Sequence, residues 1–118
     1  MFQLYEKDFE FSLNGKPRIT DRRVKGKPGL VMFKTDWCGF CQRAKPEFKA
    51  SSEMLGKSAF FATVDCDKSK KLAEKMGIKG FPTIYFVNKK GELDGVFTGE
   101  RSKFAFNQYM CVRGRACL

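Results

Sequence analysis

The residues with the clearest chemistry in this sequence are Cys38 and Cys41, two cysteines separated by Gly39 and Phe40. Two thiols at this spacing can close a small disulfide ring, alternate between dithiol and disulfide, or hold a metal together with further ligands. The flanking sequence decides among these possibilities. A short apolar block at 30–33 precedes the pair and suits a buried strand, whereas apolar residues after it recur at three- and four-residue steps, as on one face of a helix.

This order places Cys38 where a strand ends and a helix begins. The free backbone N–H groups of the first helical turn and the positive end of the helix dipole then point at its sulfur. Both favour the thiolate, which is the reactive form of cysteine. We therefore expect a redox-active pair, with Cys38 as the nucleophile and Cys41 one turn inside the helix. A metal site that uses the pair together with Cys111 or Cys117 is the alternative from another class.

Hydrophobic patterning along the rest of the chain predicts strands in alternation with helices. The expected elements, in chain order, are a strand at 9–13, a turn at Asn14-Gly15, a return strand at 16–20, a surface loop or short helical turn at 21–29, a buried strand at 30–35, a helix from Cys38 to about Leu55, a strand at 59–64, a short helix capped by Asp67 and closed by Gly77, a strand at 83–87, an antiparallel strand at 92–97, and a helix from Ser102 to about Met110. This order predicts a single α/β domain with a central mixed sheet flanked by helices.

Length and composition agree with one domain that has an apolar core. The chain has 118 residues, of which 42% are hydrophobic and 13 are phenylalanine. No run of about 18 apolar residues predicts a membrane-spanning helix. The first residues lack a basic segment followed by an apolar one, and the last four are not an ER-retention signal, so we expect a cytoplasmic location. Five cysteines, an odd number, agree with a reducing compartment.

The chain is strongly basic, with 23 Lys and Arg against 13 Asp and Glu and a net charge of +10. These residues are spread along the sequence, and their densest group lies at 16–27 without the interleaved aromatic residues of a single-strand nucleic-acid binder. We interpret the charge as a hydrated surface. The sequence therefore does not favour nucleic acid as a partner, and we expect no membrane partner.

Several motifs in order resemble the thioredoxin superfamily, and the similarity is greatest to a catalytic domain of protein disulfide isomerase. It covers about residues 30–110, which we take as a thioredoxin-like domain between an N-terminal extension at 1–29 (a hairpin plus a basic loop, part of the same domain) and a C-terminal tail at 111–118. The matching segments are Trp37-Cys-Gly-x-Cys41, Pro46, Val64-Asp65, Leu72-Ala73-Glu74-Lys75, Lys79-Gly80-Phe81-Pro82-Thr83 and Phe97-Thr98-Gly99-Glu100-Arg101.

The resemblance implies a thioredoxin fold and roles for the matching residues. Cys38 would attack the substrate, and Cys41 would resolve the mixed disulfide. Pro82 would be a cis-proline that faces the cysteines, so that Gly80 and Phe81 offer backbone groups to an extended substrate. Trp37 would shield one side of the disulfide. The residues that would tune its redox potential are Gly39, Phe40 and Arg101.

Three positions depart from the family pattern. Met32 stands where the family commonly has a buried acid, and Thr63 stands where it commonly has a lysine near that acid. In the family the acid serves as proton acceptor for the second cysteine, so proton transfer here must use water or another group. Phe40 replaces the isomerase's histidine and can neither hydrogen-bond nor charge-stabilise a thiolate. These departures affect rate and preferred direction, not thiol exchange itself.

The resulting hypothesis is a thiol–disulfide oxidoreductase that reduces, forms or exchanges disulfides in protein substrates. It needs no cofactor and no metal, because the two sulfurs store the electrons, but it does need a recycling reductase or oxidase as a partner. The alternative function is a thioredoxin-fold binding module with a basic docking face. Cys66 is expected as a buried free thiol, whereas Cys111 and Cys117 could form a tail disulfide, a second redox relay or two free thiols.

Overall fold

The strand that leads to the cysteine pair, β4 (Gly29–Lys34), lies at the centre of the sheet and is buried through Phe33. Its side chains alternate between two cores: Val31 and Phe33 lie in one apolar cluster, and Leu30 and Met32 lie in the other. A strand covered on both faces has to be apolar throughout, which explains the continuous hydrophobic run. The computed structural model describes all residues 1–118.

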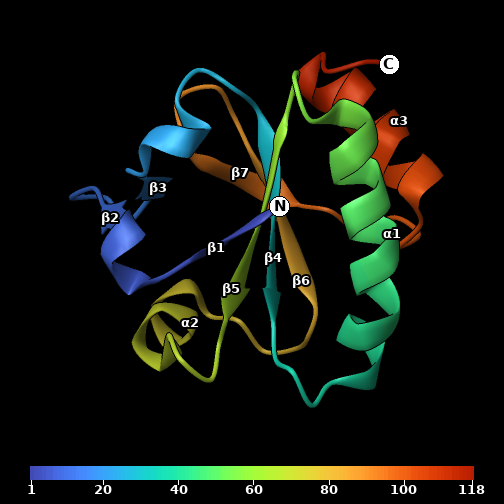
Figure 1. Ribbon diagram of the computed structural model, residues 1–118. Coiled ribbons are helices and arrows are strands. Elements are labelled where there is room, and N and C mark those ends of the chain that lie inside the picture. Colours follow the sequence, from blue (N-terminus) through green and yellow to red (C-terminus); the bar gives the residue numbers. More distant parts are fainter.

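Five strands form the main sheet, in the order β1-β5-β4-β6-β7 (Figure 1). β1 (Phe2–Leu4) pairs parallel with β5 (Phe60–Asp65), and β5 pairs parallel with β4. β6 (Thr83–Val87) pairs antiparallel with β4, and β7 (Leu93–Val96) pairs antiparallel with β6. The helical crossover between β4 and β5 allows parallel pairing, and the short turn after β6 requires antiparallel pairing. The predicted mixed sheet is thus confirmed.

The other elements cover the two faces of this sheet (Figure 1). Helices α1 (Gly39–Leu55) and α3 (Lys103–Gly114) lie against each other on one face. Helix α2 (Lys70–Met76) and the hairpin of β2 (Phe9–Phe11) and β3 (Pro17–Ile19) cover the other face. Two short 3₁₀ turns complete the chain, η1 (Glu6–Asp8) and η2 (Arg22–Val24). No helix is both long and apolar enough to cross a membrane.

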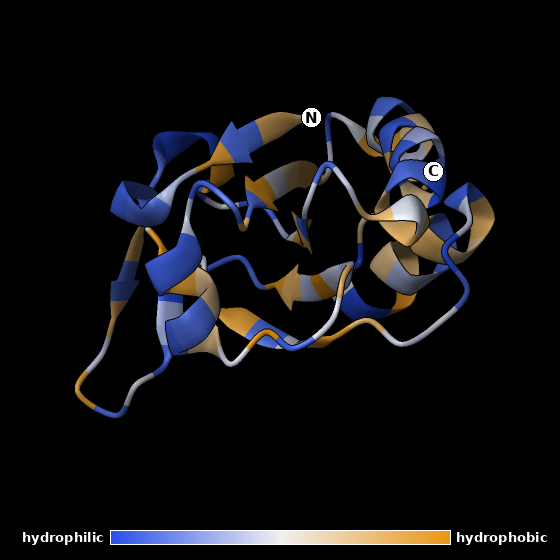
Figure 2. Cartoon of the chain, turned by 90° about the horizontal axis from the view of Figure 1, so that it is seen from below, coloured by the Kyte–Doolittle hydropathy of each residue, from blue (hydrophilic) through white to orange (hydrophobic).

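Aromatic side chains fill the core between the sheet and helices α1 and α3. Phe48 of α1 is fully buried and meets the rings of Phe61 and Phe106 edge to face, at centroid distances of 5.1 and 5.5 Å. Edge-to-face contacts at this distance stabilise a core beyond the area that they bury. Hydropathy colouring shows the same division, with apolar residues along the strands and hydrophilic residues on the outer surfaces of the helices (Figure 2).

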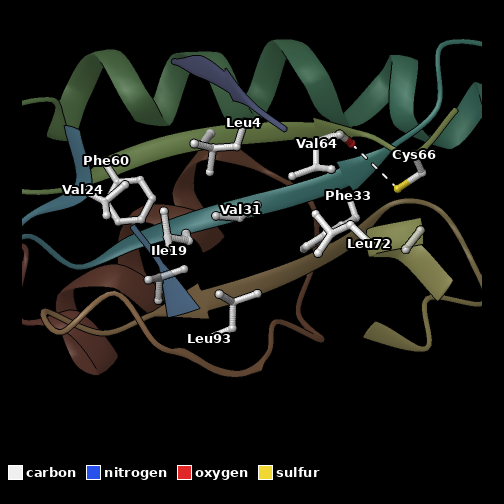
Figure 3. Close-up of a cluster of buried hydrophobic side chains, with 13 residues drawn as sticks. Leu4, Ile19, Val24, Val31, Phe33, Phe60, Val64, Cys66, Leu72 and Leu93 are labelled. Carbon is white, nitrogen blue, oxygen red and sulfur yellow. Dashed lines mark hydrogen bonds between the residues drawn. The ribbon is translucent and has the colours of Figure 1, made fainter. Parts of the chain in front are cut away.

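The second core lies between the sheet and the α2 side of the molecule. Figure 3 shows side chains from β1, β4 and β5 meeting Ile19 of the hairpin, Leu72 of α2 and Leu93 of β7. Val24, in the basic segment that the sequence predicted as a surface loop or helical turn, is buried in this cluster. The η2 turn is therefore anchored by one apolar side chain while its charged neighbours face solvent.

Three features of the fold differ from the expected elements. Phe2–Leu4 forms an edge strand that pairs with residues 62–64, which the weak alternation near the N-terminus did not predict. The N-cap of α2 is Ser69 and not Asp67, because the helix begins only at Lys70. Its first-turn N–H groups at Lys71 and Leu72 donate to the Glu6 carboxylate. The last helix continues past Met110 to Gly114.

Close backbone packing at Gly29 gives a prediction about stability. A Cβ at this position would lie 2.5 Å from the Phe60 carbonyl oxygen and would overlap the Phe60 ring. Overpacking of this kind against backbone destabilises by about 1–3 kcal/mol. We expect Gly29→Ala to lower the free energy of unfolding, measured by urea titration, by at least this amount. Gly80→Ala, where nothing lies within 4 Å of the added Cβ, should change it by no more than about 1 kcal/mol. Equal free energies of unfolding for the two variants would contradict the close packing of Gly29 against Phe60.

Candidate active site

Cys38 is the N-cap residue of α1 and lies four residues after Lys34, the last residue of β4. Its backbone is extended (φ −79°, ψ 118°), and Gly39 is the first helical residue. The Cys38 N–H donates to the Thr35 carbonyl at 3.4 Å, and the Cys38 carbonyl accepts from the Gln42 N–H at 3.0 Å. The junction between strand and helix thus holds the thiol at the position where orphan N–H groups converge.

The two thiols of the pair have opposite protonation behaviour. The backbone N–H of Cys41 is the main cause that lowers the pKa of Cys38, with smaller contributions from the Cys41 thiol, the Phe40 N–H and the positive charge of Arg101. Burial raises the pKa of Cys41 to about 11, although the backbone N–H of Thr35 and the Arg101 charge oppose the shift. Near neutral pH, Cys38 is therefore the thiol that supplies thiolate.

The segment around Pro82 faces Cys38 from the N-terminal end of β6. The Phe81–Pro82 peptide bond is cis, and the Cys38 thiol donates to the Phe81 carbonyl oxygen at 3.5 Å. The Thr83 hydroxyl donates to the Gly80 carbonyl at 2.6 Å, which fixes the loop. The structure thus brings Gly80, Phe81 and Pro82 to the same face as Cys38.

Trp37 forms one wall of this face and is 68% exposed. Its indole N–H donates to the Asp67 carboxylate at 3.0 Å, and its ring meets the Phe81 ring edge to face at 6.1 Å. The backbone N–H of Asp67 donates in turn to Asp65, which orients the turn after β5. Asp67 is a site residue that the sequence analysis missed, because a partner 30 residues away leaves no local signal.

Phe40 and Arg101 line a hollow near the cysteine pair. Phe40 is 59% exposed, and the guanidinium of Arg43 lies 4.8 Å from the centre of its ring. The hollow, of about 350 Å³, separates Phe40 and Arg43 from Gly99 and Arg101. Arg101 is exposed, yet its charge lowers the pKa of both cysteines. Trp37 and Phe40, which precede and follow Cys38 in the chain, thus both expose their rings.

A polar cleft lies beside Cys41, where the family pattern places its buried acid. Met32 is 1% exposed and belongs to the helix-side core, and Thr63 lies opposite it on β5. The cleft has a volume of about 300 Å³. Its lining consists mainly of polar side chains around the second cysteine, with the N-terminal strand at its edge: Met1, Phe2, Gln3, Met32, Lys34, Thr35, Asp36, Cys41, Gln42, Lys45 and Thr63.

The three remaining cysteines divide into one buried thiol and one disulfide. Burial raises the pKa of the Cys66 thiol to about 11, and this thiol points toward the Val64 carbonyl at 3.9 Å (Figure 3). Cys111 and Cys117 form a disulfide across the end of α3, which decides among the three alternatives that the sequence left open. These two sulfurs are therefore not available as further ligands for a metal at Cys38 and Cys41, and no group of three metal-binding side chains is assembled elsewhere.

Comparisons with known proteins agree with this geometry. The Thioredoxin family model matches residues 16–111. The chain is 36% identical over 87 residues to Protein disulfide isomerase-like 2-2 of Oryza sativa subsp. japonica, which covers 72% of this chain and 24% of that protein. The structure of Fasciola hepatica thioredoxin is 27% identical with a TM-score of 0.63, and covers 75% of this chain and 83% of that one.

A human ERp44 structure in a zinc-bound form has a TM-score of 0.73 at 23% identity, and covers 93% of this chain and 30% of that one. This likeness concerns the fold alone. The chain spans about a quarter of the length of the rice isomerase. The expected cytoplasmic location is contradicted by the curated relatives, which are protein disulfide isomerases, a family that resides in the endoplasmic reticulum.

The asymmetry of the two thiols gives a prediction about alkylation. Because the pKa of Cys38 is lowered, its modification by iodoacetamide should rise with pH and level off below the value of about 8.5 that an ordinary thiol shows. Modification of Cys41 should rise only toward pH 11. Peptide mapping by mass spectrometry at a series of pH values measures both, and the denatured chain serves as control, since both thiols should then behave alike. Equal rates in the folded chain at pH 7 would refute the assignment.

Proposed function

The chain belongs to the thioredoxin family, and from this we propose that it is a thiol–disulfide oxidoreductase that acts on disulfides of protein substrates. The observation that carries the proposal is the difference between the two thiols at the start of α1. One is surrounded by N–H donors that favour thiolate, and the other is buried and protonated until it is needed. A nucleophile and a resolving thiol require this difference.

The reaction follows from these two states. The Cys38 thiolate attacks one sulfur of the substrate disulfide, the substrate S–S bond breaks, and the other substrate sulfur leaves as a thiolate. Cys41 then loses its proton and attacks the Cys38 sulfur of the mixed disulfide. The second substrate sulfur leaves, so that the substrate is reduced by two electrons and Cys38 and Cys41 become a disulfide. The reverse sequence forms a disulfide in the substrate.

The surface around Cys38 suits an extended polypeptide substrate. The exposed Trp37 ring and the Phe81 ring form an apolar wall, and the backbone of Gly80 and Phe81 lies along the same face. Backbone groups in this position recognise main chain and not particular side chains, as in other modes of strand addition. This arrangement supports a broad range of protein substrates.

We place the activity in an oxidising compartment. The relatives support this location, and so does the Cys111–Cys117 disulfide, since such bonds persist mainly outside reducing compartments. In that setting a partner oxidase or reductase has to restore Cys38 and Cys41 after each cycle, because the pair stores only two electrons.

A second role is favoured by the basic segment around η2, which lies far from the N-terminal end of α1, where Cys38 is the cap (Figure 1). The Ile19 N–H at the end of β3 donates to the Gly91 carbonyl at 2.8 Å, which joins the segment that leads into η2 to the turn after β6. Between them lies a hollow of about 310 Å³. Its unpaired cations are Arg22, Lys25, Lys89 and Lys90.

The acid nearest to this hollow does not neutralise it. Asp21 is paired with Arg23 at 2.9 Å, and the hydrogen bond to Arg23 lowers the pKa of Asp21 to about 2. Asp21 therefore carries its negative charge at neutral pH but already pairs with Arg23, which leaves the four unpaired cations of the hollow without a partner. The shape and charge of the hollow fit an acidic polypeptide segment, and docking there leaves the cysteine face open.

The redox role predicts distinct variants of the two cysteines. With a protein disulfide such as that of insulin, Cys41→Ser should accumulate a mixed disulfide through Cys38, because the resolving thiol is absent. Cys38→Ser should accumulate none and should lose the reductase activity. Non-reducing electrophoresis followed by mass mapping checks both, and Cys66→Ser, which removes the buried thiol, is the matched control. Equal trapping by the first two variants would reject the proposed roles.

The docking role predicts a loss of binding that depends on position and not only on charge. A fluorescent peptide of ten glutamates should bind the wild-type chain at low salt and weaken as salt rises. Binding should fall at least about tenfold in the variant Arg22→Gln, Lys25→Gln, Lys89→Gln, Lys90→Gln, which costs four charges. It should persist in a control that loses four charges elsewhere, Lys49→Gln, Lys57→Gln, Lys70→Gln, Lys71→Gln. Equal losses in the two variants would mean that binding depends only on net charge. If a DNA oligonucleotide bound more tightly than the peptide, the hollow would be a nucleic-acid site and not a site for an acidic polypeptide.

A further inference from the structure

The proposed reaction leaves one proton without an acceptor in the protein interior. Cys41 has to lose its proton before it can attack the mixed disulfide, yet its thiol is only 4% exposed. Met32 on β4 and Thr63, its partner on β5, line the same cleft as Cys41. Neither of these side chains can accept a proton at neutral pH. The buried Cys66 is itself a protonated thiol with a raised pKa.

The polar cleft beside Cys41 offers a different route. Seven polar side chains line it together with the Cys41 thiol, and a volume of about 300 Å³ is ample for several water molecules. A cavity holds water when it is roomy and supplies hydrogen-bonding partners, and this cleft meets both conditions. An apolar wall alone, such as Met32, would not.

Thr35 connects the thiol with this cleft. Its backbone N–H lowers the pKa of Cys41, and Thr35 is 1% exposed and belongs to the lining of the cleft. The Thr35 hydroxyl is the one buried side-chain oxygen or nitrogen that has no hydrogen-bond partner within the protein. A buried hydroxyl without a partner is costly, so a water bound there satisfies it.

We propose that Cys41 is deprotonated through water held in this cleft by the Thr35 hydroxyl, and not by a carboxylate. The Cys41 S–H bond breaks, the proton passes to the water at Thr35, and the cleft water delivers it to solvent past Gln42 and Lys45. The Cys41 sulfur then forms the bond to Cys38, and the departing substrate thiolate takes up a proton from solvent. Thr35 is a positioning residue in this step. The inference rests on the oxidoreductase function proposed above.

The charged groups around Cys41 agree with an exit to solvent. Lys34 pairs with Asp36 and lies 4.0 Å from Asp65, and the hydrogen bond from Lys34 lowers the pKa of Asp36, which makes Asp36 a poor proton acceptor. Lys45 brings a positive charge to the lining of the cleft. From other elements, the Cys38 sulfur raises the pKa of Cys41 and Arg101 lowers it.

This route has a signature in the pH dependence of resolution. When solvent takes the proton, the rate follows the thiolate fraction and rises about tenfold per pH unit until the pKa of Cys41 is reached. An internal carboxylate instead shares the proton with the thiol, which gives a rate that is independent of pH between the two pKa values. We expect the rising form for the wild-type chain from pH 6 to 9.

The test measures the resolution step alone. The reduced full-length chain is mixed with a peptide disulfide, samples are quenched with acid, and the decay of the mixed disulfide is followed by mass spectrometry. Thr35→Val keeps the side-chain shape but removes the hydroxyl that holds the water, so the Cys41 thiolate loses this solvation and its fraction at a given pH falls. Resolution should slow by roughly tenfold, the change that a rise of one unit in the pKa of Cys41 produces. Thr35→Ser should restore the rate. Thr20→Val, which removes a hydroxyl bonded to the Asp8 carbonyl elsewhere, is the matched control and should change nothing.

A second variant tests the same idea from the opposite direction. Met32→Glu places a carboxylate beside Cys41 and should create a plateau in the pH profile, whereas Met32→Leu should keep the rising form. A plateau in the wild-type chain, or a Thr35→Val variant as fast as wild type, overturns the cleft route while the oxidoreductase function stands. A chain that forms no mixed disulfide at all overturns the function itself, and with it the route.

Discussion

The junction between β4 and α1 is the constraint on which the rest of the molecule depends. β4 is buried on both faces, so its direction and height in the sheet are set by two separate cores. α1 begins five residues after Lys34 and is anchored by Phe48 against the same sheet. Cys38 therefore lies at a helix start whose position is fixed, because a shift of β4 or α1 would break apolar contacts in the cores. A position of this kind turns a common thiol into a reactive one, because the N–H donors are fixed in advance.

The same junction separates the two cysteines chemically. Cys38 faces the Phe81 carbonyl, and Cys41, one turn further, points into the protein. The difference in their pKa values needs no charged partner in the core, since burial and backbone hydrogen bonds account for most of it. The molecule thus combines a family-like nucleophile with an interior beside the second cysteine that is lined by methionine, threonine and a polar cleft.

Much of the fold could be predicted from local patterns. The apolar run at 30–33 and the three- and four-residue repeat after Cys41 identified the central strand and the inner face of α1, because burial on one or two faces leaves a periodicity in the sequence. The hairpin at Asn14-Gly15 and the Ser102 cap of α3 were equally legible, since their hydrogen bonds join residues close in sequence. The short strand β1 was not, because its partners on β5 are about 60 residues away.

The sequence by itself determined the chemistry: two thiols at a helix start, the loop that contains Pro82, and the replacement of the buried acid by Met32. Only the tertiary structure decided which groups meet those thiols. It paired the Trp37 indole with Asp67, joined Cys111 to Cys117, and placed the unpartnered Thr35 hydroxyl beside the cleft at Cys41. The physical reason is that pKa values, hydrogen bonds and cavities depend on distances between elements, and such distances arise when apolar faces pack together and leave no periodic trace along the chain.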